Sequence, residues 1–128
     1  MVSVVVVRST QTLKQTTKQK GNKMKLMTKE IQEQAEKQYD EGSDMEQKVV
    51  AKYFDPMGSW KWFLMNKKKD DSYCWGIVKG FAVEMGSFSI DELESIKLPF
   101  GLGIERDTLF EPMKAKDVWD KLNRGEHI

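Results

Sequence analysis

Four charged residues in the second half of the chain are of the types needed for acid–base chemistry. Glu105, Arg106 and Asp107 are consecutive, and Glu84 lies upstream of them. On a strand, both carboxylates of the triplet would share one face and the guanidinium would lie on the other, because successive side chains alternate. Carboxylate pairs exchange protons when burial or a like charge shifts the pKa of one member. We favour the simpler interpretation, an ion-paired strand end, because structural ion pairs also gather charges in this way.

A second group combines aromatic and basic side chains, the types that bind single-stranded nucleic acid by base stacking and phosphate attraction. In the alternative interpretation, the tryptophans form the core of a small sheet, and Asp70 and Asp71 offset the neighbouring lysines. We favour this alternative because the body of the chain is net negative, whereas a stacking groove is usually positive. The group is also the candidate surface for a partner: Trp60, Trp62, Lys67, Lys68 and Lys69.

Cys74 and His127 are each the single residue of their type. One cysteine excludes a disulfide within the chain and any metal site that needs two cysteines. With no histidine near it in sequence to act as a base, we expect Cys74 to be a buried, unreactive thiol. The segment Gly101-Leu102-Gly103 lacks the third glycine or the Lys-Ser/Thr pair of a phosphate-binding loop. We therefore expect no catalytic residue, metal or cofactor.

Periodicity and turn residues indicate which elements position these side chains. Thr28 is a candidate helix N-cap, and Ser89 with Glu92 has the spacing of a capping box. The connections between strands are short, which favours antiparallel pairing because parallel neighbours need long crossovers. Helices are predicted over residues 28–41, from Ser89 to before Pro99, and over 117–123. Strands are predicted over 49–54, 60–65, 73–81, 83–89 and 104–110.

These elements predict a single small α+β domain over residues 24–125. Its expected architecture is an antiparallel meander of four to five strands with two or three helices packed on it. The length of 128 residues suits one domain. In the strand over 60–65, large apolar residues occur at odd and even positions alike, so we expect both faces of the sheet to be at least partly covered.

The charge distribution divides the chain into an arm and a body. Residues 1–23 hold five basic residues and no acidic one, so a net charge of +1 for the chain becomes −4 for residues 24–128. We expect residues 1–23 to be a basic, unordered extension that could touch nucleic acid. The longest apolar run, Val4 to Val7, is far below the ~18 residues of a membrane span, and no secretory signal is recognisable. A cytoplasmic protein without a membrane partner is the expectation.

Three blocks of sequence carry a resemblance to a known family. They are Lys52-Tyr53-Phe54-Asp55-Pro56, then Gly80-Phe81 with residues 84–94, and then residues 98–107. With their spacing, they resemble the domain-of-unknown-function family 2958 over about residues 24–112. The start Met24-Lys25-Leu26-Met27-Thr28 is similar to the beginning of such proteins, which supports treating residues 1–23 as an extension. The arm and residues 116–128 depart from the family pattern.

The resemblance implies a gene of a phage, plasmid or conjugative element, often among anti-restriction and DNA-handling genes, and implies no catalytic residue set. We therefore expect a non-enzymatic protein in the cytoplasm of a bacterial host that binds a host or element-encoded protein, in host takeover or counter-defence. The alternative is an accessory protein that binds single-stranded nucleic acid through the arm and the hairpin over residues 60–69. A third possibility is an enzyme that uses Glu84, Glu105, Arg106 and Asp107.

Overall fold

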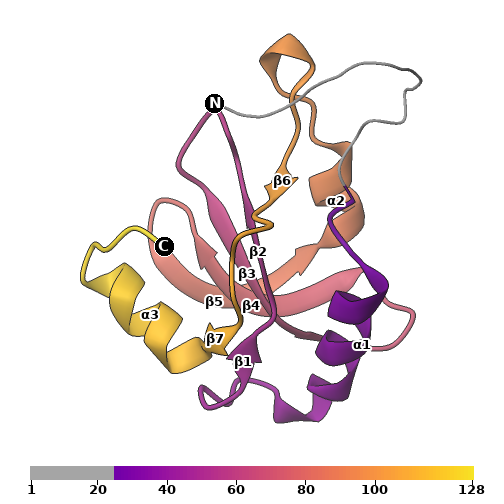
Figure 1. Ribbon diagram of the computed structural model, residues 1–128, viewed down its shortest axis with the longest axis vertical. Helices are drawn as coiled ribbons and strands as arrows, with labels where there is room; N and C mark the ends of the chain where they lie inside the picture. Colours follow the sequence, from indigo (N-terminus) through magenta and orange to yellow (C-terminus); the bar gives the residue numbers. More distant parts are fainter. Residues whose placement is uncertain (1–24) are drawn as a thin grey trace.

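A computed structural model describes residues 25–128 of the protein. Five strands form its central sheet, in the order β5-β4-β3-β2-β6 with every neighbouring pair antiparallel (Figure 1). The predicted α+β domain built on an antiparallel meander is confirmed. The predicted extension over residues 1–23 and the predicted domain start at Met24 lie outside the described residues.

The first four strands of this sheet follow one another in sequence, and the fifth returns to the opposite edge. After the meander, a helix and a loop carry the chain across to pair β6 with β2. The strands are β2 (Ala51–Phe54), β3 (Lys61–Lys67), β4 (Tyr73–Lys79), β5 (Val83–Ser89) and β6 (Glu105–Arg106). Two further short strands, β1 (Lys48–Val49) and β7 (Met113–Lys114), form a separate two-stranded antiparallel sheet.

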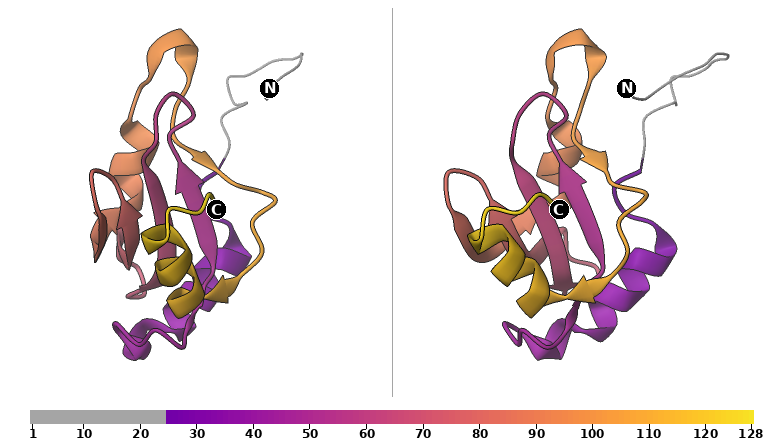
Figure 2. Two further views of the ribbon diagram at one scale, coloured as in Figure 1. Left: turned by 90° about the vertical axis from the view of Figure 1, so that its left-hand side faces the viewer. Right: turned by 60° about the vertical axis from the view of Figure 1, so that its left-hand side comes forward.

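Helices cover both faces of the five-stranded sheet (Figures 1 and 2). The helix α1 (Lys29–Lys37), followed by the 3₁₀ turn η2 (Tyr39–Glu41), and the helix α2 (Ile90–Ser95) pack on one face, which we call the α1/α2 face. The helix α3 (Ala115–Asn123) packs on the other, the α3 face. Two separate hydrophobic cores result, one on each side of the sheet.

The central strand β3 shows why both cores form. Trp62 and Leu64 belong to the core under α1 and α2, while Phe63 and Met65 belong to the core under α3. All four are buried, so the expectation that both faces are covered is confirmed. Because alternation here separates two cores rather than core from solvent, the strand is apolar at every one of these positions.

A β-bulge at Met65 changes the direction of the residues that follow it. Leu64 pairs with Gly76 but Asn66 pairs with Trp75, so Met65 is an extra residue in β3. Odd-numbered positions face α3 before the bulge, yet Lys67 pairs with Cys74, which lies in the core on the α1/α2 face. The extra residue therefore moves Lys67 to the side of α1. Gln38 holds the bulge by donating from Nε2 to the Met65 carbonyl at 2.7 Å.

The helix starts were predicted well and some element ends were not. The Thr28 side chain accepts the Ile31 N–H, and the Ser89 side chain accepts the Glu92 N–H, which confirms both caps. The strand predicted over 104–110 is wrong beyond Arg106, because the Asp107 carboxylate accepts the Leu109 N–H and turns the chain. The helix predicted over 28–41 ends at Lys37 before η2, and the helix predicted from 117 begins at Ala115.

Candidate functional site

Large hydrophobic side chains are exposed in three turns at one end of the five-stranded sheet. Antiparallel topology places the β2–β3 turn, the β4–β5 turn and the loop between α2 and β6 at this end. Figure 2 shows the first and last of these projecting together beyond the sheet. We call the set the aromatic end; it consists of Met57, Trp60, Phe81, Phe100 and Leu102, which are 48%, 36%, 99%, 90% and 36% exposed.

The tip of the α2–β6 loop holds Phe100 in a backbone conformation that bulky residues avoid. Phe100 has φ 64° and ψ 26°, and Gly101 follows with φ 74°. The Leu102 N–H donates to the Pro99 carbonyl at 3.3 Å and closes the turn. Positive φ at both central residues is the pattern of a type I′ turn, whose usual residues are asparagine, aspartate and glycine. The strained backbone points an aromatic ring into solvent, a combination typical of functional sites.

Trp60 and Phe81 contact each other across the β2–β3 and β4–β5 turns. Their ring centroids lie 5.5 Å apart in an edge-to-face arrangement. The Trp60 ring also covers Gly80 so closely that a Cβ atom at that position would overlap it. Glycine therefore leaves the space that this contact needs. This contact fixes the two turns relative to each other.

Three lysines lie close to these turns on the α3 face. Lys52 pairs with Phe63, and Lys79 pairs with Lys61, so the three share one face of neighbouring strands. Burial, followed by the positive charges of Lys52 and Lys79, lowers the pKa of Lys61. Asp107 offsets part of the charge through an ion pair with Lys52 at 3.1 Å. A shallow hollow of about 210 Å³ lies here, lined by Lys52, Lys61 and Asp107 among others.

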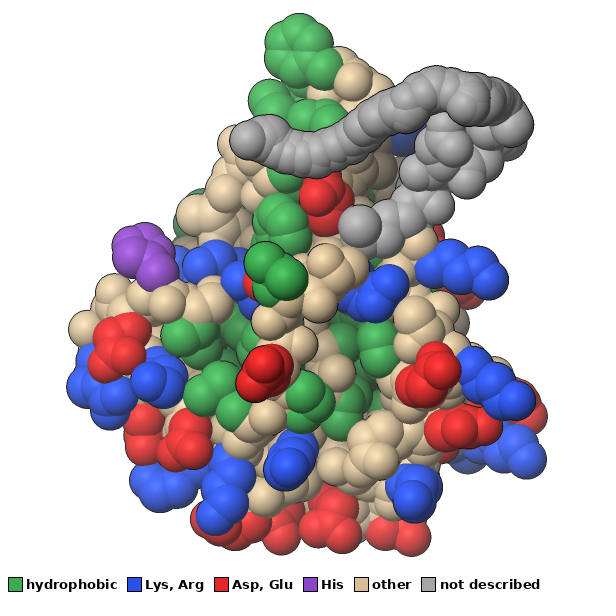
Figure 3. All heavy atoms as spheres, viewed as in Figure 1, with side chains coloured by type: hydrophobic (Ala, Val, Ile, Leu, Met, Phe, Trp, Pro, Cys, Tyr) green, Lys and Arg blue, Asp and Glu red, His purple; other side chains and the backbone are tan. Residues whose placement is uncertain are grey.

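Figure 3 shows how charge and hydrophobicity are distributed over one side of the molecule. Hydrophobic side chains gather over the α2–β6 loop at the top of the view. Lysine, arginine, aspartate and glutamate side chains concentrate over the lower half, around α1 and α3. The tip of the α2–β6 loop on this side is therefore apolar and set apart from the charged surface.

The predicted partner-binding group does not form one surface. Trp60 is exposed, but Trp62 is 8% exposed and lies in the core on the α1/α2 face. Lys67 to Lys69 lie at the other end of β3, roughly 20 Å from Trp60 at ~3.3 Å per residue. The expected proximity of these lysines to Trp60 is therefore wrong, because a full strand separates them. Of the tryptophans, Trp75 is the one beside them, since it pairs with Asn66.

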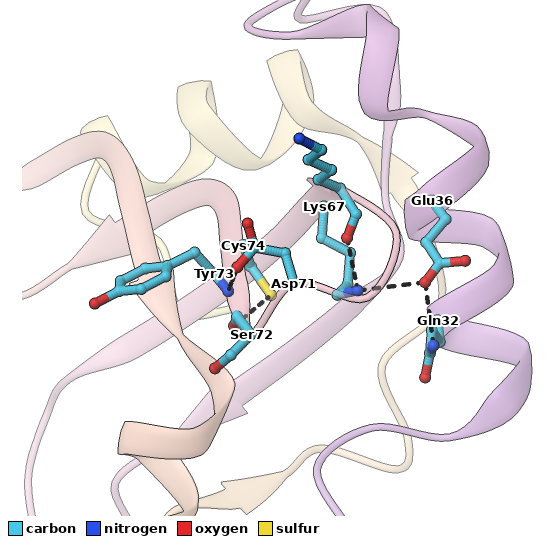
Figure 4. Close-up of polar contacts among 8 residues, drawn as sticks. Gln32, Glu36, Lys67, Asp71, Ser72, Tyr73 and Cys74 are labelled. Atoms are coloured by element: carbon cyan, nitrogen blue, oxygen red, sulfur yellow. Dashed lines mark hydrogen bonds and ion pairs between the residues drawn. The ribbon is translucent and has the colours of Figure 1, made fainter.

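Lys67 is buried at its own end of the sheet and has an internal role. Its ammonium group donates to the Glu36 carboxylate at 3.3 Å and to the Lys68 carbonyl at 2.9 Å (Figure 4). The Gln32 side chain also donates to this carboxylate. These contacts, the Gln32 hydrogen bond first, lower the pKa of Glu36. Lys67 thus fastens the β3–β4 hairpin to α1, while Lys68 and Lys69 are exposed.

The four charged residues with acid–base potential are not brought together. Glu84 lies on β5 and Glu105 on β6, at opposite edges of the five-stranded sheet and about 19 Å apart at ~4.8 Å per strand. Asp107 pairs with Lys52. The Arg106 guanidinium donates to the Lys25 carbonyl at 3.1 Å. A site made of all four residues is therefore not formed, and the ion pair of Asp107 with Lys52 fits the ion-paired strand end that we favoured.

Cys74 and His127 have contrasting environments. Cys74 is 2% exposed, and burial raises the pKa of its thiol to about 12, as for an unreactive cysteine. His127 is exposed near the end of the chain. Within residues 25–128, no three His, Cys, Asp or Glu residues are grouped so that they could hold a metal ion. None of the helices in this range is long and apolar enough to cross a membrane.

Sequence reasoning missed Met57, Phe81, Phe100 and Leu102. The available signal was local: Phe81 lies between Gly80 and Ala82 in a three-residue turn, and Phe100 lies between Pro99 and Gly101. Aromatic residues in turns have no neighbouring strand to cover them, and this would have marked both as exposed.

The model of a family described as "Protein of unknown function (DUF2958)" matches residues 20–127, which is most of the chain. The match includes residues 116–127, so the expectation that this segment departs from the family pattern is wrong. No curated protein and no solved structure matches this chain.

Proposed function

Since the chain belongs to the DUF2958 family of proteins of unknown function, we propose its function from its surface: it binds another protein through the aromatic end. The observation that carries this proposal is the nearly complete exposure of Phe81 and Phe100 on turns at one end of the sheet. Aromatic residues and methionine are enriched in protein interfaces, and a few such anchors supply most of the binding free energy.

The geometry of the aromatic end supports the proposal in two ways. The Trp60 ring covers Gly80 and meets the edge of the Phe81 ring, so Trp60 is held in place before any partner arrives. Preorganised anchors lose little conformational entropy on binding. The left-handed backbone of Phe100 lowers the stability of the folded state. Such a cost is expected where a side chain is positioned for binding. In the phage or mobile-element setting that the resemblance implies, the partner is a host or element-encoded protein.

The proposal is tested by capture of a partner from nuclease-treated host lysate on the full chain. Phe81→Ala combined with Phe100→Ala should lower recovery of the partner more than tenfold, which corresponds to at least ~1.4 kcal/mol. The matched control is Tyr73→Ala, because Tyr73 is 56% exposed and lies at the other end of the sheet. A partner captured equally by all three chains would contradict the proposed site.

One observation favours single-stranded nucleic acid as a second candidate. Trp60 and Phe81 lie near Lys52, Lys61 and Lys79, so stacking groups and positive charge occur at the same end of the sheet. Binding of a fluorescent single-stranded oligonucleotide to the full chain would then weaken steeply with salt. It would also weaken with Lys61→Gln, whereas protein capture should not depend on nucleic acid.

A further inference from the structure

The strand β5 forms an open edge of the five-stranded sheet. It pairs on one side with β4 over all seven residues, and no strand from residues 25–128 lies on its other side. Natural proteins protect such edges with bulges, prolines or lysines, because unpaired N–H and C=O groups readily recruit another strand. The strand β5 has none of these protections. Its pairing with β4 has no bulge, it contains no proline or lysine, and Glu84 is its only charged residue.

The hydrogen bonds at the two ends of the β4–β5 pair show which backbone groups are unpaired. Ile90 N–H donates to the Ser72 carbonyl and Gly80 N–H to the Ala82 carbonyl, each at 3.0 Å. Hydrogen-bonded pairs alternate along an antiparallel ladder, so even-numbered residues of β5 bond to β4. The N–H and C=O groups of Val83, Met85 and Ser87 therefore point away from the sheet. No hydrogen bond reaches them from residues 25–128.

We propose that β5 accepts an extended segment of a protein partner as a sixth strand of the sheet. This inference rests on the proposed function, because Phe81 of the aromatic end lies in the turn that leads into β5. A partner that contacts Phe81 is thereby brought to the start of the open edge. The segment needs about five residues to span Val83 to Ser87, and backbone hydrogen bonds supply its register.

The side chains of β5 define what the segment should carry. A Cβ atom on Gly86 would meet no atom within 4 Å, so this position leaves open space on the α1/α2 face. A large side chain directly opposite can cover such a glycine, and an aromatic one does so best. The exposed Glu84, two residues away on the same face, favours lysine or arginine opposite it. An antiparallel segment should therefore contain the pattern aromatic–any residue–basic.

A second copy of the chain fits this edge poorly. Two β5 strands paired about a twofold axis at Gly86 would place glycine opposite glycine, and an axis at Met85 would place Glu84 opposite Gly86. An axis at Ser87 would place Phe88 opposite Gly86, but Phe88 is 8% exposed and belongs to its own core. A foreign segment supplies the covering side chain that a second copy lacks.

Hydrogen exchange and a peptide library test the inference on the full chain. In the free protein, the amides of Glu84, Gly86 and Phe88 should exchange slowly and those of Val83, Met85 and Ser87 rapidly. Random seven-residue peptides displayed on phage should be enriched for the aromatic–any–basic pattern. A synthetic copy of an enriched peptide should then slow exchange at the three rapid amides. A library that yields no such peptide, or peptides that leave these amides unprotected, would overturn the inference.

Ser87→Pro removes one outward N–H without removing a bond to β4, and Ser87→Ala is its matched control. Ser87→Pro should weaken binding of the peptide at least about tenfold, because a proline on an edge strand blocks pairing with an added strand. Ser87→Ala should leave binding of the peptide unchanged. Glu84→Lys keeps the backbone intact and should shift the selected pattern from basic to acidic residues. Equal affinity of the proline and alanine variants for the peptide would overturn the inference. So would an unchanged pattern in the peptides selected with Glu84→Lys. A homodimer of the full chain that Ser87→Pro dissociates would also overturn it.

The same variants separate this inference from the proposed function. If capture of the partner protein is lost with Phe81→Ala and Phe100→Ala but retained with Ser87→Pro, the proposed function is supported and the added sixth strand is contradicted. If capture is lost with Ser87→Pro alone, binding at the open edge is supported and binding at the aromatic end is contradicted.

Discussion

At the scale of single residues, Phe100 joins a strained backbone to an exposed ring. A left-handed conformation costs a residue with a Cβ atom about 1 kcal/mol, and asparagine tolerates it better. Phe100→Asn should therefore raise the free energy of unfolding by up to about 1 kcal/mol in urea denaturation, while it weakens partner capture. Leu109→Asn is the control, because Leu109 is 89% exposed without positive φ. A loss of stability with Phe100→Asn would show that the ring contributes to folding.

The buried thiol of Cys74 makes a stability contribution that depends on pH. Burial raises its pKa from 9.0 to about 12, so the folded state favours the protonated thiol more than the unfolded state does. This contribution is fully present below pH 9 and is lost as the pH rises toward 12, with a slope of at most ~1.4 kcal/mol per pH unit. Cys74→Val lacks the thiol, so the stability difference between the chains should shift in favour of the variant between pH 8 and pH 10.5. A constant difference would contradict this assignment.

At the scale of elements, Ser89 joins a strand to a helix. Its hydroxyl accepts the Glu92 N–H at 3.2 Å and shares a hydrogen bond with the Ser72 hydroxyl at 2.8 Å. Ser72 in turn accepts the Asp91 N–H at 3.2 Å, so two serines cap the start of α2. Ser89→Ala should lower the free energy of unfolding by about 1 to 2 kcal/mol, measured by urea denaturation. The more exposed cap Thr28→Ala should cost less, and the reverse order would contradict this account.

The elements also show what local sequence does and does not determine. Caps, turns and the order of the strands in the meander follow from short-range signals, and these were predictable. The two-residue strands β1 and β7 pair across the chain and leave no periodicity, so no local pattern indicates them. The exposure of Trp60 and the burial of Trp62 were not separable either, since alternation places both on one face of the predicted strand. Trp60 lies in the turn before β3, whereas Trp62 belongs to the core on the α1/α2 face.

At the scale of the whole molecule, α3 closes one of the two cores. Its buried residues Ala115, Val118 and Leu122 lie in the same core as Phe63 and Ile77 from the sheet. Removal of residues 115–128 should expose that core, so the shortened chain should bind a hydrophobic dye and lose its cooperative thermal transition. A chain shortened by an equal number of residues at the other end, 1–14, is the control and should keep the transition. Cooperative unfolding of both would show that the sheet is stable without α3.

The positions of the four tryptophans give the molecule a built-in optical reporter. Trp60 is the exposed one, while Trp62 is buried and Trp75 and Trp119 are partly buried. Quenching by acrylamide in solution should therefore act first on Trp60, which lies among the side chains that we expect a partner to cover. Docking at the aromatic end would shift the emission of this indole toward shorter wavelength and shield it from the quencher. Association can thus be followed by light emission without attaching a dye.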